Sequence, residues 1–411
     1  MTQKIKQRIE QIQRGEAPDG YTNTPIGVLP SDWGYAPLSE LSDVIEEQVG
    51  DRDYETLSIS AGIGFVNQAA KFGKELSGNQ YSKYIVLHKG DFAYNKGNSN
   101  RYPQGCTYML KERETAAVPN VFECFRIHDD VPKYYEQLFL FGFMNKQLAR
   151  LINHGVRDDG LLNLTDKDFY SVILPVPPTE EQRKIAEILA TCDRVIELKQ
   201  KLLDELKKLK KVRLEKMFPQ KGNSVPEIRF PGFTAPWEQR KVSEVCSIST
   251  GKSNTQDKID DGVYPFYVRS PIIERSNRYL YDEEAVLTVG DGVGTGKVFH
   301  YVNGKYDLHQ RVYRLFGFTE DTDAKFFYHW FSENFYDRVM SMTAKTSVDS
   351  VRLEMIADME MTAPSYAEQR RIANYFDSID NLITLHQQEL EAALQKKKVL
   401  MQLLLTGIVR V

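Results

Sequence analysis

The stretch EEQRKIAEIL, residues 180–189, returns almost unchanged as AEQRRIANYF at 367–376. The two copies align at an offset of 187 positions, and matching residues continue as far as Lys210 in the first copy and Lys397 in the second. Self-similarity at a fixed offset over this length is the mark of an internal repeat. The chain is therefore predicted to be a tandem duplication.

Each copy has the pattern of a long helix. Proline-containing turns precede both copies, and acidic residues occupy their first turns, as is usual at helix N-termini. Apolar residues then follow in alternating steps of three and four, which indicates a coiled-coil seam. In the first copy they are Ile185, Leu189, Cys192, Ile196, Leu203 and Leu206, with Leu202 and Leu209 alongside. In the second copy they are Ile372, Phe376, Ile379, Ile383, Leu390, Leu400 and Leu404.

Polar residues interrupt both seams at equivalent places. Lys199 corresponds to His386, and Lys210 corresponds to Lys397. Such residues cost stability but can fix the register of a coiled coil. One helix cannot bury its own apolar stripe, so we predict that the two copies pair with each other in antiparallel orientation. The alternative is that each helix packs only on the body that precedes it.

One body precedes each repeated helix. Each body opens with the pattern W-x4-[LV]-S-E-[LV], as WGYAPLSEL at 33–41 and WEQRKVSEV at 237–245. Short β-rich runs alternate with Gly, Asn and Asp turns in both bodies, and a helical stretch lies near each end, at 133–153 and 324–342. The predicted fold class is α+β, with two mixed α/β domains joined by two long helices in an antiparallel coiled coil, and with internal pseudo-two-fold symmetry. The predicted boundaries are 1–20 for an N-terminal helical lead, 21–178 for the first body, 179–218 for the first helix, 219–363 for the second body, and 364–411 for the second helix and tail.

Composition excludes several classes of protein. The 411 residues carry a formal net charge of −4, so any nucleic acid would be bound by local basic surfaces. The sequence shows no apolar run of membrane-spanning length and no signal-peptide pattern, so we expect a cytoplasmic protein. The four cysteines form no CxxC pair and the seven histidines form no metal-binding spacing, so reduced thiols and no metal site are expected.

Enzyme signatures fail when their residues are counted. The stretch GDGVGTGKV at 290–298 lacks the glycine and the hydroxyl residue that a P-loop requires. The catalytic [DN]PP[YFW] tetrapeptide of amino-methyltransferases does not occur. Asp204, Glu205 and Lys207 imitate a nuclease cluster, but they are better explained as the charged face of the coiled coil. No catalytic residue is predicted.

The order of these motifs resembles the DNA-specificity (S) subunits of type I restriction–modification systems. The resemblance is carried by the paired Glu-Gln-Arg helix openings and the paired tryptophan patterns, with GDFAYNK at 90–96 and LLLTGIVRV at 403–411. It implies that each body is a target-recognition domain that reads one half of an asymmetric, bipartite DNA site. The helices would set the gap between the halves and dock two adenine-N6 methyltransferase (M) subunits, and the restriction (R) subunits would join through that complex. S-adenosylmethionine, ATP and Mg²⁺ would belong to these partners, and this chain would be non-catalytic.

Candidate contact residues follow from this interpretation. Basic and amide side chains in loops can reach phosphates and base edges. The DNA-binding candidates are Lys96, Asn98, Asn100, Arg101, Arg157, Lys252, Arg269, Lys297, Lys345, Thr346, Ser347 and Arg352. The partner-docking candidates are Glu181, Gln182, Arg183, Glu368, Gln369 and Arg370.

Three further points stay open at the level of sequence. One alternative is a duplicated coiled-coil scaffold that binds protein or glycan without DNA specificity. Another is an enzyme with an unrecognised site. We also expect the charged lead, residues 1–20, to pack against the C-terminal tail.

Overall fold

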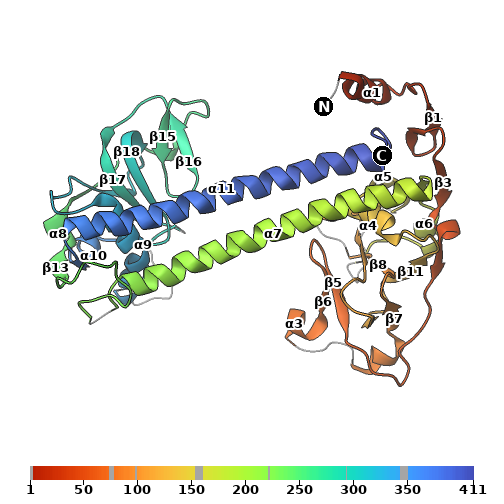
Figure 1. Ribbon diagram of the computed structural model, residues 1–411, viewed down its shortest axis with the longest axis horizontal. Helices are drawn as coiled ribbons and strands as arrows, with labels where there is room; N and C mark the ends of the chain where they lie inside the picture. The colour runs from red at the N-terminus through yellow and green to blue at the C-terminus, as the bar shows by residue number, and fades with distance from the viewer. Residues whose placement is uncertain are drawn as a thin grey trace. The chain divides into compact units, whose positions relative to one another are not determined.

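The computed structural model describes residues 3–73, 78–97, 100–152, 161–220, 223–292, 294–342 and 350–411. The chain forms two compact units, the first made of Met1–Leu198 with Leu390–Val411 and the second of Lys199–Glu389. Each unit contains one body and a part of both long helices, α7 (Thr179–Met217) and α11 (Tyr366–Leu405), which Figure 1 shows. Among the described residues, none of the helices combines the length and the apolar character needed to cross a membrane.

The helices pair in antiparallel orientation in each unit. In the second unit, Lys199 Nζ lies 2.8 Å from a carboxylate oxygen of Glu389, and Lys210 Nζ lies 2.7 Å from Asp380. Since the partner number in α11 falls as the α7 number rises, the helices run in opposite directions. In the first unit, Lys397 Nζ lies 2.5 Å from Asp193.

The polar interruptions of the seam are therefore paired across it. Lys210 with Asp380 and Lys397 with Asp193 are the same pair repeated, because both members are related by the offset of 187. His386 joins the Lys199 pair, with Nδ1 3.1 Å from Glu389. The predicted fold class, including the antiparallel coiled coil, is confirmed.

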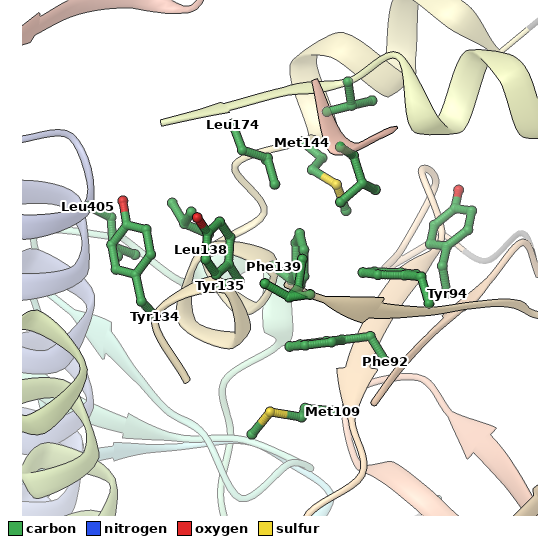
Figure 2. Packing of buried hydrophobic residues seen from close by; sticks show 14 of the residues in the cluster. Phe92, Tyr94, Met109, Tyr134, Tyr135, Leu138, Phe139, Met144, Leu174 and Leu405 are labelled. Carbon is green, nitrogen blue, oxygen red and sulfur yellow. The ribbon is translucent and has the colours of Figure 1, made fainter. Parts of the chain in front are cut away.

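Each body has a core that both helices complete. In the first unit the buried cluster contains Ile185 and Leu189 from the start of α7. It also contains Met401, Leu404 and Leu405 from the last turns of α11, and Figure 2 shows Leu405 beside Tyr134. In the second unit, the equivalent residues at the same offset are Leu214, Met217 and Phe218, which are buried with Ile372 and Phe376. Both packing alternatives are therefore correct, because each long helix packs on the body that precedes it and also contributes residues to the core of the other body.

The first body is built from short strands and helices. Its elements are α1 (Gln3–Gln13), β1 (Tyr21–Thr24), β2 (Gly27–Pro30), β3 (Gly34–Pro37), α2 (Leu38–Leu41), β4 (Ser42–Val44), β5 (Leu57–Ser60), β6 (Gly64–Asn67), α3 (Gln68–Phe72), β7 (Ile85–His88), β8 (Phe92–Asn95), β9 (Cys106–Met109), β10 (Thr115–Val118), β11 (Glu123–Ile127), α4 (Pro132–Phe141), α5 (Asn145–Leu151), α6 (Asp166–Tyr170) and β12 (Ile173–Val176). A four-stranded sheet has the order β4-β11-β8-β9, and the other strands form two-stranded pairs.

The helical stretch predicted at 133–153 is interrupted. Gly142 adopts a left-handed conformation with φ of 76°, and its N–H bonds back to the end of α4. This is a glycine helix cap, after which the chain starts again as α5. The break is not evident from the sequence, because the apolar periodicity of a helix continues through Gly142.

The second body has one larger sheet. Its elements are β13 (Glu238–Lys241), α8 (Val242–Val245), β14 (Ser247–Thr250), β15 (Tyr264–Tyr267), β16 (Ile273–Ser276), β17 (Tyr281–Val289), β18 (Phe299–Leu308), β19 (Val312–Phe316), α9 (Ala324–Ser341), α10 (Leu353–Ala357) and β20 (Glu360–Ala363). The six-stranded sheet has the order β14-β19-β17-β18-β15-β16, antiparallel except between β15 and β18.

The two sheets share their central pairings. In the first body β11 pairs with both β4 and β8, and β8 pairs with β9. In the second body β19 pairs with both β14 and β17, and β17 pairs with β18. The strand that directly follows the repeated tryptophan, Trp33 or Trp237, also pairs with the strand that leads into the long helix, as β3 with β12 and β13 with β20. The bodies are thus variants of one topology.

Candidate nucleic-acid interface

Loops that follow several strands of the second body contact one another. They follow β14, β15, β17 and β18, and the segment just before α10 joins them. The contacts are a bridge between Ser253 and His309, a hydrogen bond of 3.0 Å from His309 N–H to the Tyr267 carbonyl, one of 2.9 Å from Gly290 N–H to the Arg311 carbonyl, and a bridge between Asp291 and Ser350. Segments far apart in sequence therefore form one surface, which we call the second loop cluster.

Two arginines flank one carboxylate in the second loop cluster. Asp291 Oδ2 lies 3.9 Å from Arg269 and 4.0 Å from Arg311. The arginine side chains are 48% and 61% exposed, so these contacts are weak and leave both guanidinium groups accessible. Burial lowers the pKa of His309, and the positive charges of Arg269 and Arg311 lower it further, so this ring is neutral at pH 7.

The structure brings together most described candidates from this body. Lys252, Arg269 and Arg352 are exposed in segments of the second loop cluster. Lys297 is exposed in the loop after β17, with its Nζ 5.2 Å from the centre of the Tyr336 ring in α9. Lys345, Thr346 and Ser347 lie outside the described residues.

Arg311 is absent from the predicted set. It lies in the short turn between β18 and β19, where a single arginine among apolar strand residues gives no signal of its own. Its place beside Arg269 depends on the parallel pairing of β15 with β18, which sequence alone does not reveal. β16 and β17 lie between these two strands in the sequence, so the pairing of β15 with β18 depends on the tertiary fold.

A corresponding loop cluster exists in the first body. The loop after β8 meets the segment before α6 through a bridge between Gly97 and Leu161. The turn between β5 and β6 borders the loop after β8, because a Cβ at Gly62 would lie 2.9 Å from the hydroxyl oxygen of Tyr102 in that loop. Gly62 N–H also donates a hydrogen bond of 2.7 Å to the hydroxyl of Tyr108 in β9. Arg101 is exposed and stacks over the ring of Tyr102, at 5.7 Å from its centre. We call this surface the first loop cluster.

The predicted residues of the first body fare differently. Asn100 and Arg101 are exposed, whereas Asn98 and Arg157 lie outside the described residues. Lys96 is largely buried, with Nζ 2.5 Å from Glu123 and 2.9 Å from Asp166. Burial lowers the pKa of Lys96, but the hydrogen bonds to these two carboxylates outweigh it and raise the pKa overall. Lys96 therefore neutralises two acids inside the body, and its ammonium group is not free for a phosphate.

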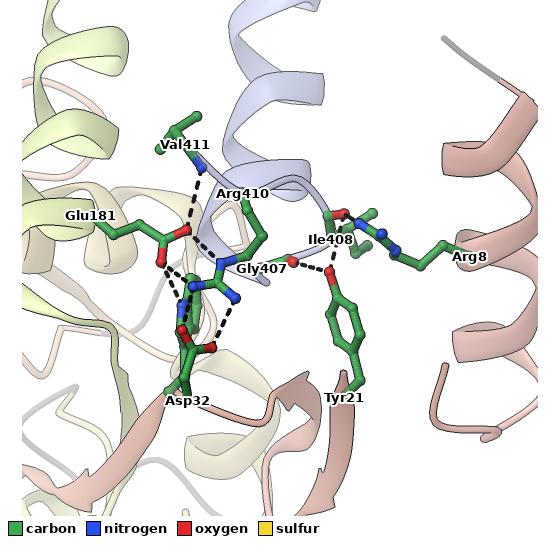
Figure 3. A network of polar contacts seen from close by, with 9 residues as sticks. Arg8, Tyr21, Asp32, Glu181, Gly407, Ile408, Arg410 and Val411 are labelled. Atoms are coloured by element: carbon green, nitrogen blue, oxygen red, sulfur yellow. Dashed lines mark hydrogen bonds and ion pairs between the residues drawn. The ribbon is translucent and has the colours of Figure 1, made fainter. Parts of the chain in front are cut away.

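Of the six docking candidates, the acidic and amide side chains are internal. Glu181 is 5% exposed and receives hydrogen bonds of 2.7 Å from Arg410 and 2.9 Å from the Trp33 indole N–H, as Figure 3 shows for Arg410. Glu368 is fully buried and receives two hydrogen bonds of 2.7 Å from Arg229. The equivalent glutamates are thus held by arginines from different parts of the chain.

The glutamines of the same motif join each long helix to its body. Gln182 donates to the Asp129 carboxylate at 2.9 Å, and Gln369 accepts from the backbone N–H of Asp323 at 3.0 Å. Asp129 lies just before α4 and Asp323 caps α9, so both glutamines fix the start of a body helix. Only Arg183 and Arg370 of the motif are exposed among the six candidates. A docking role for the motif stays a prediction, and it would involve these two arginines.

The C-terminal tail closes the first unit. Arg410 also pairs with Asp32 at 2.7 Å, and the Tyr21 hydroxyl donates to the Gly407 carbonyl at 2.7 Å (Figure 3). A side chain at Gly407 would collide with Pro30, 2.5 Å from the position of its Cβ. Arg8 of α1 donates to the Ile408 carbonyl at 2.5 Å, so the charged lead contacts the tail.

An exposed apolar stripe runs along each long helix, apart from the seam. Its residues are spaced mainly by three, four and seven, and each is at least 37% exposed. In α7 they are Val195, Leu198, Leu202, Leu209 and Val212, and in α11 they are Leu382, Leu385 and Val399. Val195, Leu198 and Val212 correspond to the three α11 residues at the repeat offset. A second stripe with heptad spacing is the pattern of a helix that packs against additional helices.

The described residues hold no group of three or more metal-ligating side chains. All four cysteines are free thiols, with Cys124 and Cys246 buried. Burial raises the pKa of the Cys246 thiol to about 12, which makes it unreactive at neutral pH.

A comparison with protein families matches both halves of the chain to one family. Residues 30–208 and 235–395 both match the model of the type I restriction modification DNA specificity domain. The chain belongs to the type I restriction–modification DNA specificity family. Two matches in one chain, each covering a body and much of the following helix, account for the internal repeat.

Two specificity subunits are similar in sequence to most of this chain. The type I restriction enzyme MjaVIII specificity subunit of Methanocaldococcus jannaschii is 28% identical over 305 residues, covering 68% of this chain and 72% of the relative. The putative MjaX specificity subunit of the same organism is 22% identical, covering 96% of this chain and 97% of the relative.

Solved structures of the same fold also match. The crystal structure of the type I restriction–modification S subunit from M. genitalium superposes with a TM-score of 0.62 at 14% identity, covering 90% of this chain and 96% of that one. A chain from a structure on the complex assembly and conformational transition of the type I system has a TM-score of 0.53 at 16% identity, covering 93% and 99%. At these identities the likeness concerns the fold.

Proposed function

We propose that this specificity subunit reads a bipartite, asymmetric DNA site, with the first body on one half and the second body on the other. The observation that carries the proposal is the loop cluster on each body. The second cluster gathers exposed basic side chains from separate segments, and the first presents the exposed Arg101, which suits phosphate and base contacts. The two clusters differ in residue type, so the two half-sites should differ in sequence.

Base reading by the second body is assigned to Arg269 and Arg311. Their guanidinium groups are exposed and both lie within 4.0 Å of one carboxylate oxygen of Asp291, so the two groups are near each other on the surface. A guanidinium presents a fork that fits the O6 and N7 atoms of guanine in the major groove. The second half-site should therefore contain guanine, and Lys252 and Arg352 would neutralise nearby phosphates.

The two long helices are proposed to set the gap between the half-sites. A helix of the length of α7, 39 residues, measures ~58 Å at 1.5 Å per residue. Half-sites read from one side of DNA are separated by about one helical turn, ~34–36 Å, or multiples of it. Inserting four residues near Lys199 should lengthen the unspecified gap, and an unchanged gap would contradict this role.

The exposed stripes on α7 and α11 are the proposed docking surface for methyltransferase subunits. Three of the five α7 stripe residues, Val195, Leu198 and Val212, have apolar equivalents in α11 at the offset of 187, which supports two docking surfaces and two M subunits per chain. Helices of the partner would cover the exposed leucines and valines in a bundle. Restriction subunits would join through this complex, and S-adenosylmethionine, ATP and Mg²⁺ would be bound by the partners. The DNA substrate places this activity in the cytoplasm, and this chain supplies specificity without catalysis.

An exchange of bodies tests the proposal. Replacing residues 21–178 by the first body of another family member should change one half of the methylated motif and leave the other half and the gap unaltered. Methylation of adenine N6 in host DNA is the readout. A change in both halves, or in neither, would contradict the assignment of one half-site to each body.

A further inference from the structure

Two hairpin turns carry isoleucines that nothing in the fold buries. Ile63 is 75% exposed and Ile272 is 66% exposed, and with Val263 they are the most exposed large apolar residues among those described. Ile63 lies in the turn between β5 and β6, and Ile272 lies in the turn between β15 and β16 (Figure 1). An isolated exposed apolar residue is ordinary, but each of these isoleucines lies in a turn beside an exposed arginine of a loop cluster, Arg101 or Arg269.

Both hairpins follow the first strand of the main sheet in chain order. Each is an antiparallel pair inserted between the first strand of the sheet, β4 or β14, and the central strand, β8 or β17. Their pairings differ, because β5 and β6 form a separate two-stranded sheet, whereas β15 joins the six-stranded sheet beside β18. The sequences AGI (61–63) and VRSPI (268–272) differ, yet both end in isoleucine directly before the second strand.

Both turns border the loop clusters. In the first body, Gly62 bonds to Tyr108 and lies against Tyr102, whose hydroxyl is 2.9 Å from the position of a Cβ at Gly62. Tyr102 follows Arg101, so the turn is held beside an exposed arginine. In the second body, the turn begins after Tyr267, which is bonded to His309, and contains Arg269 of the second loop cluster.

The turns do not need isoleucine for their own conformation. In the first body, Gly62 and Gly64 have φ of 85° and 108°, so glycines supply the left-handed backbone. Turns of this kind usually carry Gly, Asn, Asp or Ser, whose side chains suit water. The isoleucines therefore provide apolar surface at a place where the rest of the cluster provides charge.

We propose that Ile63 and Ile272 each contact the C5-methyl group of a thymine, one in each half-site. This proposal rests on the proposed function and adds to it a specificity-determining residue for each body. The thymine methyl is the apolar group that base pairs display in the major groove, and apolar side chains recognise it by contact. The neighbouring arginines would engage phosphates or guanine while the isoleucine distinguishes thymine from cytosine.

The test uses the full chain in complex with its methyltransferase subunits. Once the wild-type motif is known, duplexes are prepared in which each thymine of the motif is replaced singly by deoxyuridine, which lacks the methyl group. The affinity of the wild-type complex should fall about tenfold at one position in each half-site, as for the loss of one specific base contact. In Ile63→Ser the sensitivity should vanish only in the first body's half-site, and in Ile272→Ser only in the other.

Matched controls separate base contact from general apolar character. Val263 is 68% exposed at the opposite end of β15 from the turn, and Phe72 is 46% exposed in α3, beyond the far end of β6. Val263→Ser and Phe72→Ser should keep the wild-type response to deoxyuridine. If the isoleucine variants respond as these controls do, or if wild type ignores every deoxyuridine, the thymine contact is refuted while the proposed function stands. A wild-type complex that methylates no split motif would instead refute the proposed function.

Discussion

The hydrogen bonds that hold Glu181, which we call the Glu181 clamp, predict how much stability the first unit loses when one of them is removed. The Glu181 side chain is 6% exposed and is held by a two-pronged hydrogen bond from Arg410, by Trp33 and by Asp32 through the same arginine. Removing one member of a fully buried ion pair costs ~3–5 kcal/mol. Arg410 is 37% exposed, so water can reach the carboxylate after Arg410→Ala, and the Trp33 bond remains. We expect a local loss of about 2 kcal/mol, which corresponds to ~30-fold faster opening.

Hydrogen exchange of the full chain, followed by mass spectrometry, measures this loss locally. Arg410→Ala should accelerate exchange about 30-fold in residues 30–41 and 179–190 and leave residues 366–376 unchanged. Arg229→Ala is the matched control, because Arg229 holds the equivalent Glu368 and is only 15% exposed. It should show the reverse pattern with a larger effect, about 3–4 kcal/mol. Equal exchange in Arg410→Ala and wild type would refute the conclusion that the tail holds the first unit.

Three further predictions concern pH, register and docking. Burial raises the pKa of Glu181, but hydrogen bonds from Arg410 and Trp33 outweigh it and lower the pKa overall. The ionised Glu181 therefore stabilises the folded chain above the unfolded carboxyl's pKa of ~4.3, and this stabilisation is lost as pH falls. Thermal melts of wild type and Glu181→Gln should differ at pH 7 and converge below about pH 4, whereas a constant difference would contradict this. Exchanging the charges of the seam pair, Lys397→Asp with Asp193→Lys, should restore stability that either single change lowers by about 1 kcal/mol in urea unfolding, and an additive double variant would argue against the pair. Leu198→Glu with Leu385→Glu should abolish co-purification of the methyltransferase, while Glu197→Gln beside the stripe should not, and retained binding in the leucine variant would exclude the stripe as the docking surface.

The helices could be predicted from sequence because their signals are local and repeated. Heptad spacing placed the seam, and the offset of 187 identified the lysines that interrupt it; each of these lysines pairs with an acid of the other helix. The spacing predicts that Leu202 and Leu209 lie alongside the seam, but both side chains face solvent. Two apolar stripes on one helix look like a single wide stripe until the partner's position is known.

The functional sites could be predicted only in part, because they depend on tertiary contacts. Loop composition indicated Arg269 and Arg352, but it could not show that Arg311 lies beside Arg269 or that Lys96 forms ion pairs with two carboxylates. The Glu-Gln motif looked like a docking surface because it was the strongest repeat. Its burial shows another reason for repetition: each copy fastens a long helix to its body.

The central claim is that one chain reads two different half-sites, one with each body. Single-molecule sequencing of DNA from a host that carries this subunit and its methyltransferase tests it most directly. N6-methyladenine should appear in a single motif with two different specified halves and a fixed unspecified gap, with a methylated adenine in each half. Methylation confined to a continuous motif, or N6-methyladenine in no split motif despite an active methyltransferase, would contradict the claim.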